Sequence, residues 1–203
     1  MQFFIINVSC QKPEKIKTYY ENGNLKEIGK ISNGKQTGLW KFYHQNGQLK
    51  KTGNFLNGKE TGEWKKYYDN GQLERIGEFI DGKHTGEWKN YYNSGQLERI
   101  GEFSGNNITG EWKYYFENGK LEKTGSFSNR QRTGKWKSFH KNGQLYTIRV
   151  YDSGKLMNIV SCFDGKGNSL DKGTLMNGNG TVKTYDINSK LSQEYEVANG
   201  KKK

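Results

Sequence analysis

The chain has 203 residues, a formal net charge of +12, 31% hydrophobic residues and a mean hydropathy of −1.05. Such a polar composition is typical of disorder, but 14% of the residues are aromatic, and aromatic side chains bury enough area for a few per repeat to hold an ordered sheet. No stretch approaches the roughly 18 apolar residues of a membrane-spanning helix. Two cysteines are too few for a disulfide framework.

The first ten residues, "MQFFIINVSC", form a short apolar run that ends in small residues and Cys10. This run resembles the end of a bacterial lipoprotein signal, in which the cysteine after the small residues is lipidated and anchors the protein to a membrane. Only nine residues precede Cys10 and none is basic, unlike a complete secretory signal. Segment 1–16 is therefore either a signal remnant or a frayed first strand, and location in the cell envelope or the cytoplasm stays open.

From residue 17 to residue 150 the sequence repeats every 24 residues without an insertion. Self-similarity at a fixed period is typical of an array of one supersecondary unit. The columns that keep this register include Trp40, Trp64, Trp88, Trp112 and Trp136; the strand glycines Gly29, Gly53, Gly77, Gly101 and Gly125; the turn glycines from Gly23 to Gly143; and the closing glycines from Gly38 to Gly134.

Each repeat is predicted to be a β-hairpin. Asn-Gly pairs such as Asn70-Gly71 stand between runs rich in Tyr, Phe, Trp and Ile, and Asn-Gly favours the two-residue type I′ turn. Counting outward from this turn gives the opposed pairs Tyr68 and Leu73, Lys66 and Arg75, and Trp64 and Gly77.

Alternation of side chains places Trp64, Gly77 and Phe79 on one face of the sheet. We expect the bare Gly77 to let the indole of Trp64 lie flat across the strand. Either neighbouring hairpins bury the resulting row of tryptophans, which we favour, or the row is a docking surface. If the tryptophans are buried, a partner would meet the opposite face, which carries Tyr43, Tyr67, Tyr91 and Tyr115.

The second connection, "FIDGKHTG", is predicted to be a longer loop that ends at Gly86 and returns the chain beside the last strand. The expected fold is all-β, an elongated single-sheet antiparallel meander of tandem 24-residue β-hairpin repeats within one domain, 17–203. After residue 150 the tryptophan is lost, so 151–179 is interpreted as an irregular unit and 180–203 as a degenerate closing repeat.

No convergence of groups in the sequence indicates catalysis, and none has the spacing of a metal or cofactor site. His44 and His140 occupy the column held elsewhere by Tyr20, Tyr68, Tyr92 and Phe116, so they are interpreted as aromatic substitutes, whereas His84 is expected in solvent. Cys162 is interpreted as a small apolar filler. The excess positive charge lies in the later repeats and the tail rather than recurring with the fold, so a nucleic-acid partner is not expected.

The repeated pattern Tyr-x-x-Asn-Gly-x-Leu, followed by Gly-x-Phe-x-x-Gly-Lys-x-x-Gly-x-Trp, resembles the MORN-repeat variant of bacterial proteins grouped as the YwqK-like antitoxin family. The likeness spans 17–149 well and 180–201 weakly. It implies a hairpin array, no enzymatic activity and binding of a partner protein. The residues that carry it are turn glycines and packing aromatics, so it names no functional site.

Two functions follow as hypotheses. The first is a non-enzymatic protein-binding module, such as an antitoxin or immunity-type protein that binds a toxin or effector. The alternative is a structural lipoprotein that is tethered to the envelope through Cys10 and binds a surface. Neither the partner nor the oligomeric state can be predicted from the residues.

Overall fold

The computed structural model describes residues 12–203, so Cys10 and most of the predicted N-terminal segment lie outside the described residues. The described chain contains strands and no helix. The strands are β1 (Glu14–Tyr19), β2 (Leu25–Ser32), β3 (Lys35–Tyr43), β4 (Leu49–Leu56), β5 (Lys59–Tyr67), β6 (Leu73–Ile80), β7 (Lys83–Tyr91), β8 (Leu97–Ser104), β9 (Asn107–Tyr115), β10 (Leu121–Ser128), β11 (Gln131–Phe139), β12 (Leu145–Asp152), β13 (Lys155–Cys162), β14 (Gly180–Tyr185), β15 (Leu191–Ala198) and β16 (Lys201–Lys202).

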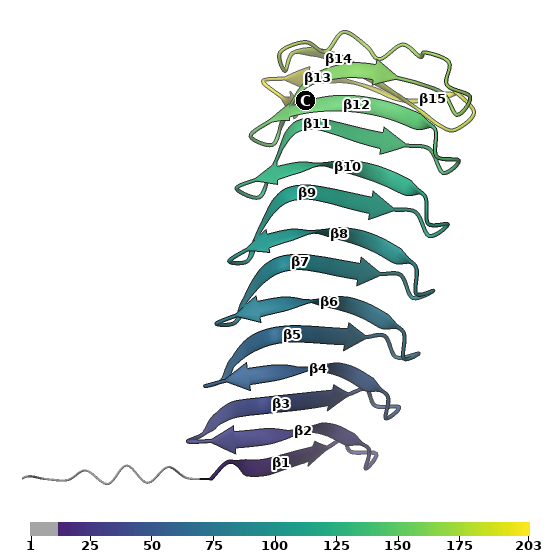
Figure 1. The fold of residues 1–203 in the computed structure, drawn as a ribbon. Coiled ribbons are helices and arrows are strands. Elements are labelled where there is room, and N and C mark those ends of the chain that lie inside the picture. The colour runs from purple at the N-terminus through teal and green to yellow at the C-terminus, as the bar shows by residue number, and fades with distance from the viewer. Residues whose placement is uncertain (1–11) are drawn as a thin grey trace, which may run out of the picture.

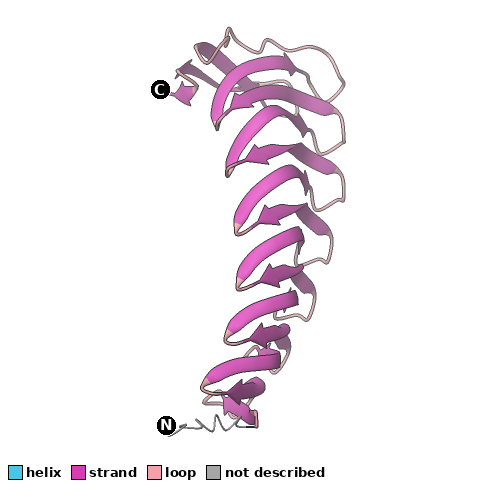
Figure 2. Cartoon of the chain, turned by 60° about the vertical axis from the view of Figure 1, so that its left-hand side comes forward, coloured by secondary structure: helices cyan, strands magenta, loops and turns pink. Residues whose placement is uncertain are grey.

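The predicted all-β meander is confirmed. Strands β1 to β13 form one 13-stranded antiparallel sheet in which every strand pairs with its neighbours in the sequence, and the sheet is long and narrow (Figure 1). The strands bend along their length, so the sheet is curved across its width (Figure 2). Strands β14 to β16 form a separate three-stranded sheet at the C-terminal end.

The Asn-Gly turns are three-residue turns rather than the two-residue type I′ turns predicted. The N–H of Gly71 donates to the carbonyl of Tyr68 at 3.0 Å, and the N–H of Tyr68 donates to the carbonyl of Gln72 at 2.9 Å. Gly71 has a φ of +86°, whereas Asn70 keeps a negative φ. This geometry is a type I turn followed by a glycine bulge, and it places Tyr67, not Tyr68, opposite Leu73. The other predicted pairs, Lys66 with Arg75 and Trp64 with Gly77, are confirmed.

The two-residue turns lie instead at the second connection, which is shorter than predicted. Asp81 and Gly82 both have positive φ, 51° and 74°, and Ile80 pairs directly with Lys83. Positive φ at both central residues is the requirement of a type I′ turn. Gly86, the expected end of a long loop, lies inside β7 with a φ of +63°.

The closing glycines make a bulge at which the indoles cross the sheet. Between the pairs Thr52 with Lys65 and Asn54 with Thr61, β4 contributes one residue and β5 contributes three. The extra residues re-aim the strand, and the indole of Trp64 lies over Gly53 of the preceding strand. A Cβ atom added to Gly53 would lie 2.2 Å from the indole Cδ2.

The prediction that the indole of Trp64 covers Gly77 is therefore wrong, although the two residues are opposed in register. Gly77 is covered by Trp88, from the next repeat. The ends of the array follow the same rule, because Trp136 is opposite Arg149, and the strand after Arg149 has no tryptophan. A strand therefore requires glycine at this position only when the next strand in the sequence carries a tryptophan that covers it. A tryptophan opposite the position in the preceding strand imposes no such requirement.

Turn side chains tie successive repeats together at one edge of the sheet. The side-chain oxygen of Asn70 accepts the N–H of Gln72 within the same turn, and its amide donates to the carbonyl of Asn93 in the next turn. The same amide-to-carbonyl bond is made by Asn22, Asn46, Asn118 and Asn142. Ser94 occupies this column in one repeat and makes no such bond among the described residues.

The three-stranded sheet covers the C-terminal end of the large sheet. Leu156 and Ile159 of β13 form a buried cluster with Leu175, Val182 and Val197. Two backbone hydrogen bonds join the same parts, from Leu156 to Gly200 and from Gly178 to Met157. Strand β13 thus belongs to the large sheet, while β14 to β16 shield its last strand from solvent.

The indole–glycine contact predicts which tryptophan is coupled to which glycine. Gly77→Ala should lower the free energy of unfolding by about 1–3 kcal/mol because the new methyl group meets the ring of Trp88. In a double-mutant cycle followed by circular dichroism in urea, Gly77→Ala should couple to Trp88→Leu and not to Trp64→Leu. Coupling to Trp64→Leu alone would show that the opposed residue is the true partner.

Replacing Ser94 by asparagine should complete the row of turn amides. Ser94→Asn places an amide beside the carbonyl of Glu117, at the same offset as in the other repeats, and should raise the free energy of unfolding by about 0.5–1.5 kcal/mol. Asn70→Ser, the reverse change, should lower it by a similar amount. Thermal denaturation of both variants is the measurement, and a Ser94→Asn protein no more stable than the parent would contradict the role given to these amides.

Candidate functional site

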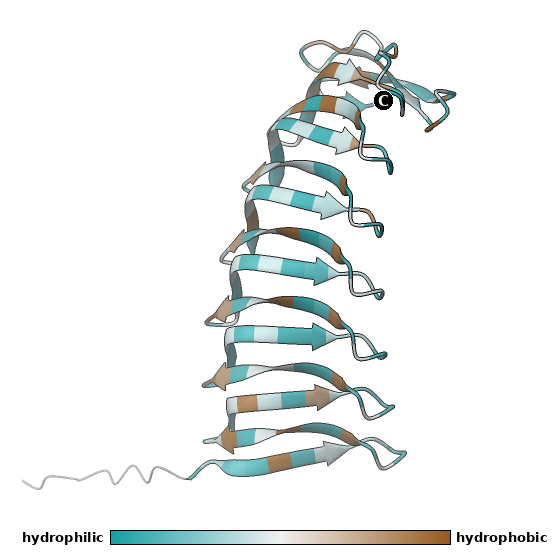
Figure 3. Ribbon diagram, turned by 45° about the vertical axis from the view of Figure 1, so that its right-hand side comes forward, coloured by the Kyte–Doolittle hydropathy of each residue, from teal (hydrophilic) through white to brown (hydrophobic). Residues whose placement is uncertain are grey.

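One face of the sheet, here called the tryptophan face, carries the five tryptophans, which are only 2% to 4% exposed. Their rings alternate with phenylalanines in edge-to-face contacts, such as Phe55 with Trp64 at 5.0 Å and Phe79 with Trp88 at 5.2 Å between ring centroids. Each indole N–H donates to a backbone carbonyl at 3.1 Å. The tryptophans are therefore buried by neighbouring hairpins, and hydrophobic positions recur at corresponding places along successive strands (Figure 3).

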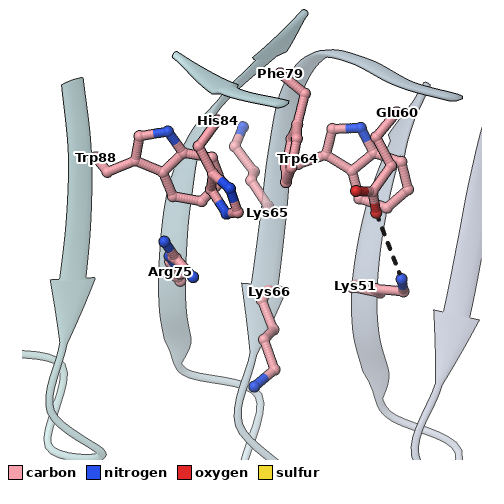
Figure 4. Close-up of a pocket in the computed structure, with 9 residues that line it drawn as sticks. All are labelled: Lys51, Glu60, Trp64, Lys65, Lys66, Arg75, Phe79, His84 and Trp88. Atoms are coloured by element: carbon pink, nitrogen blue, oxygen red, sulfur yellow. Dashed lines mark ion pairs between the residues drawn. The ribbon is translucent and has the colours of Figure 1, made fainter. Parts of the chain in front are cut away.

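Cations lie beside this aromatic stripe in the middle repeats. The guanidinium carbon of Arg75 lies 4.2 Å from the centroid of the Trp88 ring, and Lys51 Nζ lies 4.4 Å from that of Phe42. Attraction between a cation and a ring face favours both contacts. Lys51 also forms an ion pair with Glu60 at 3.7 Å (Figure 4).

Arg75 has no such ion pair among residues 12–203, and its Nε atom is buried without a hydrogen-bond acceptor. Burial lowers the pKa of Arg75, and the neighbouring charge of Arg99 lowers it further. The Nε atom of Arg99 is also buried without an acceptor. Two neighbouring guanidinium groups thus have unmet hydrogen-bonding capacity on the tryptophan face.

His84 lies on the tryptophan face beside Trp88, so the prediction that it lies in solvent is wrong. Because the preceding turn has only two residues, His84 falls within β7, opposite Phe79. Its ring centroid is 4.5 Å from those of Phe79 and Trp88, and its Nδ1 atom lies 2.8 Å from the side-chain oxygen of Asn106. Figure 4 shows the His84 ring and the Arg75 guanidinium group beside the Trp88 ring, and all three side chains line a cavity of about 110 Å³.

The other two histidines replace tyrosines in the turns. The hydroxyl of Tyr68 donates to the carbonyl of Tyr91 at 2.7 Å, and the Nε2 atoms of His44 and His140 lie 3.0 Å and 2.9 Å from the carbonyls at the same offset. These side chains therefore join successive repeats. Tyr20, His44, Tyr68, Tyr92 and His140 all make this bond, whereas Phe116 cannot, so the column accepts an aromatic ring without the bond but gains the bond wherever the side chain can form it.

The opposite face, here called the tyrosine face, carries the predicted partner-binding residues Tyr43, Tyr67, Tyr91 and Tyr115, all half-buried. A lysine lies beside each tyrosine. Glu63, 2.8 Å from Lys65 Nζ, raises the pKa of Lys65, and Tyr67 adds to the rise. The structure thus places the predicted tyrosines on one face, two strands apart.

The sequence-based prediction that positive charge does not recur with the repeat overlooked one column of lysines. A lysine follows every tryptophan, and register joins Lys17, Lys41, Lys65, Lys89, Lys113 and Lys137 across the tyrosine face. In the middle repeats Glu63, Glu87 and Glu111 form ion pairs with these lysines. This face therefore carries mixed charge at its centre and net positive charge at its ends. The repeated Trp-Lys pair is the signal that could have shown this.

Within residues 12–203, no cluster of three or more histidine, cysteine or acidic residues could hold a metal ion, and no helix is long and apolar enough to cross a membrane. Cys162 is 3% exposed, and burial raises the pKa of its thiol. A buried, protonated thiol packs as a small apolar side chain.

The repeats match one family model, the MORN repeat variant, at residues 15–33, 36–57, 60–81, 85–104, 108–129 and 132–153, which together exceed half of the chain. The chain belongs to the MORN repeat variant family. MORN repeats commonly form protein- or membrane-binding modules. No curated protein sequence matches this MORN repeat chain.

Among solved structures, the chain is similar to the crystal structures of TcdB2-TccC3 and TcdB2-TccC3-TEV, with TM-scores of 0.26 and 0.22 and identities of 12% and 13%. Each match covers 94% of this chain and 13% of the other chain. At these TM-scores the likeness defines neither a fold nor a function.

Because the Nε atom of Arg75 is buried without a hydrogen-bond acceptor, we expect this side chain to contribute little to the free energy of unfolding. Arg75→Met keeps an apolar stem on Trp88 and removes a charge with a buried, unpartnered nitrogen, so the free energy of unfolding should change by less than about 1 kcal/mol. Arg132→Met is a matched control, because Arg132 also lies on a tryptophan but donates to the hydroxyl of Tyr151. Urea unfolding measures both variants, and a loss above about 2 kcal/mol for Arg75→Met would give this arginine a structural role.

Proposed function

We propose that this chain is a non-enzymatic protein-binding module that presents its tyrosine face to a partner protein. The observation that carries the proposal is the division between the two faces. The indoles are buried by packing between neighbouring hairpins and are not accessible to a partner. The tyrosine face, by contrast, carries four half-buried tyrosines, each beside a lysine: Tyr43, Tyr67, Tyr91 and Tyr115. Tyrosines are enriched at protein interfaces because they combine a large apolar ring with a polar hydroxyl.

The arrangement favours a rigid, repeated contact. The tyrosines recur every second strand, roughly 10 Å apart, in a sheet whose strands are tied by turn hydrogen bonds. A partner that contacts several of them pays little entropy for ordering this surface, because the backbone is already held. Such a surface suits one extended interface better than a single small ligand.

We further propose that the partner is a toxin or effector and that binding neutralises it, an antitoxin or immunity role. The resemblance of the repeated motif to the YwqK-like antitoxin family supports this proposal. The mixed charge at the centre of the tyrosine face also supports it, because alternating lysines and glutamates can give a partner specificity and register.

Tyrosine-to-serine variants of the tyrosine face should reduce partner capture without unfolding the chain. Tyr67→Ser and Tyr91→Ser should each weaken binding of a protein recovered from the native cell by roughly tenfold or more, because large aromatic side chains at the centre of an interface carry most of its binding energy. Tyr195→Ser, in the C-terminal sheet, is the control. Affinity is measured with the purified partner, and circular dichroism checks folding. Unchanged affinity in both folded variants would reject this face.

A growth assay separates the antitoxin role from binding alone. Expression of the recovered partner should arrest growth, and co-expression of this chain should restore growth unless Tyr67 and Tyr91 are both replaced. A partner that binds through the tyrosine face but is harmless when expressed alone would leave the binding module standing and reject the antitoxin role.

A further inference from the structure

A row of cations runs across the tryptophan face in the middle of the array only. Cross-strand pairing links Lys51, Lys66, Arg75, Asn90, Arg99, Tyr114 and Lys123 in this order from β4 to β10. In the first repeat the same row holds Glu27 and Phe42, and at the other end it holds Ser138 and Thr147. The row formed by Lys51, Arg75, Arg99 and Lys123, here called the basic row, is therefore not a general property of the repeat.

The charges in the basic row are unequally compensated. Lys51 has Glu60 at 3.7 Å and Lys123 has Glu122 at 3.1 Å, whereas the Nε atom of Arg99 lies 4.0 Å from Glu98. Arg75 has no ion pair within the described residues, and its Nε atom is shielded from water. A partly buried cation with unused donors is destabilising unless an anion meets it. The centre of the row therefore favours an incoming anion.

The cavity beside Arg75 limits the size of that anion. It measures about 110 Å³ and is bounded by Trp64, Phe79, His84 and Trp88 together with the arginine. Aromatic rings form its walls, and Lys51, Lys65 and Lys66 also line it, together with Glu60, whose carboxylate is paired with Lys51 (Figure 4). A side-chain carboxylate fits a space of this size, and an arginine fork matches carboxylate geometry. A nucleotide or a sugar ring would not enter it whole.

Spacing identifies the kind of chain that could carry such carboxylates. Successive members of the basic row are two strands apart, roughly 9.6 Å. A polyproline II segment has three residues per turn and a rise of about 3.1 Å, so every third side chain points the same way at intervals of about 9.3 Å. A β-strand repeats one side about every 6.7 Å and matches the row less well. Aromatic grooves are also the surfaces on which polyproline II segments dock.

We propose that the basic row binds an acidic polyproline II segment of a partner protein, with carboxylates at every third residue meeting Lys51, Arg75, Arg99 and Lys123 and one of them seated in the cavity beside Arg75. The proposal deepens the proposed function, on which it rests for the ligand being a protein segment. It adds a second contact surface on the face opposite the tyrosines.

The test uses the full chain and a fluorescent peptide with four Glu-Pro-Pro units, followed by fluorescence anisotropy. The peptide should bind, and replacing its glutamates by glutamine should abolish binding. Two peptides of equal charge, one with its glutamates in a block and one helical with glutamates seven residues apart, should bind roughly tenfold or more weakly. Equal or tighter binding of either peptide, or of a single-stranded oligonucleotide of equal charge, would overturn the proposal.

Variants of the chain locate the site. Arg75→Met and Arg99→Met should each weaken binding of the Glu-Pro-Pro peptide roughly tenfold or more. Lys113→Met, which removes a charge of the same sign from the tyrosine face, should change it less than about twofold because an exposed, distant charge is screened. If all three variants lost the same affinity for the peptide, binding would depend only on the net charge of the chain, and the proposed site would be rejected.

The peptide assay tests the basic row and the capture assay tests the tyrosine face, so either proposal can be rejected without the other. If Tyr67→Ser and Tyr91→Ser abolish partner capture while the Glu-Pro-Pro peptide does not bind, the basic row is rejected and the proposed function stands. If the peptide binds as expected but no partner depends on the tyrosine face, the proposed face is rejected and the basic row stands.

Discussion

The structure depends on one contact, the indole of each repeat lying over a glycine of the preceding strand. A single-layer sheet has no second layer to cover its backbone, and here the next hairpin supplies that cover. A Cβ atom at Gly29, Gly53, Gly77, Gly101 or Gly125 would lie within 2.3 Å of a tryptophan ring atom, so the contact admits no larger residue without a shift. Because the cover always comes from the following strand, the contact gives the array a direction and requires a constant repeat length.

This contact also explains how so polar a chain is ordered. The tryptophans and the phenylalanines between them form an unbroken line of edge-to-face pairs from Trp40 to Tyr151. The stems of Lys51 and Arg75 lie on this line and extend it with apolar area while their charged ends stay at its margin. Most other positions can then be polar. The line ends at Tyr151, and beyond it an aliphatic cluster around Val182 takes its place.

The repeat period, the strands and the register around Trp64 could be predicted because they follow from identity between columns. The turn types could not be read from the dipeptide alone, since Asn70-Gly71 and Asp81-Gly82 both suit a type I′ turn, and hydrogen bonding by the Asn70 side chain favours the longer turn at the first. That error placed His84 in a loop. The two ends of the array could have shown which glycine each indole covers. Gly29 has Ile16 opposite it and no tryptophan, and Trp136 has Arg149 opposite it and no glycine. Each tryptophan must therefore cover the glycine of the preceding strand.

The register of a bound partner is best sought in the columns that vary within this constant frame. The tryptophan and glycine columns keep their identity because packing dictates them, and a surface that is the same in every repeat would bind equally at any register. The column of Arg75 instead runs Glu27, Lys51, Arg75, Arg99, Lys123 and Thr147, and that of His84 runs Gln36, Glu60, His84, Ile108, Arg132 and Leu156. Their changes distinguish the middle of the array from its ends. A ligand that meets these columns can therefore bind in one register only, which a uniform lattice of identical repeats could not impose.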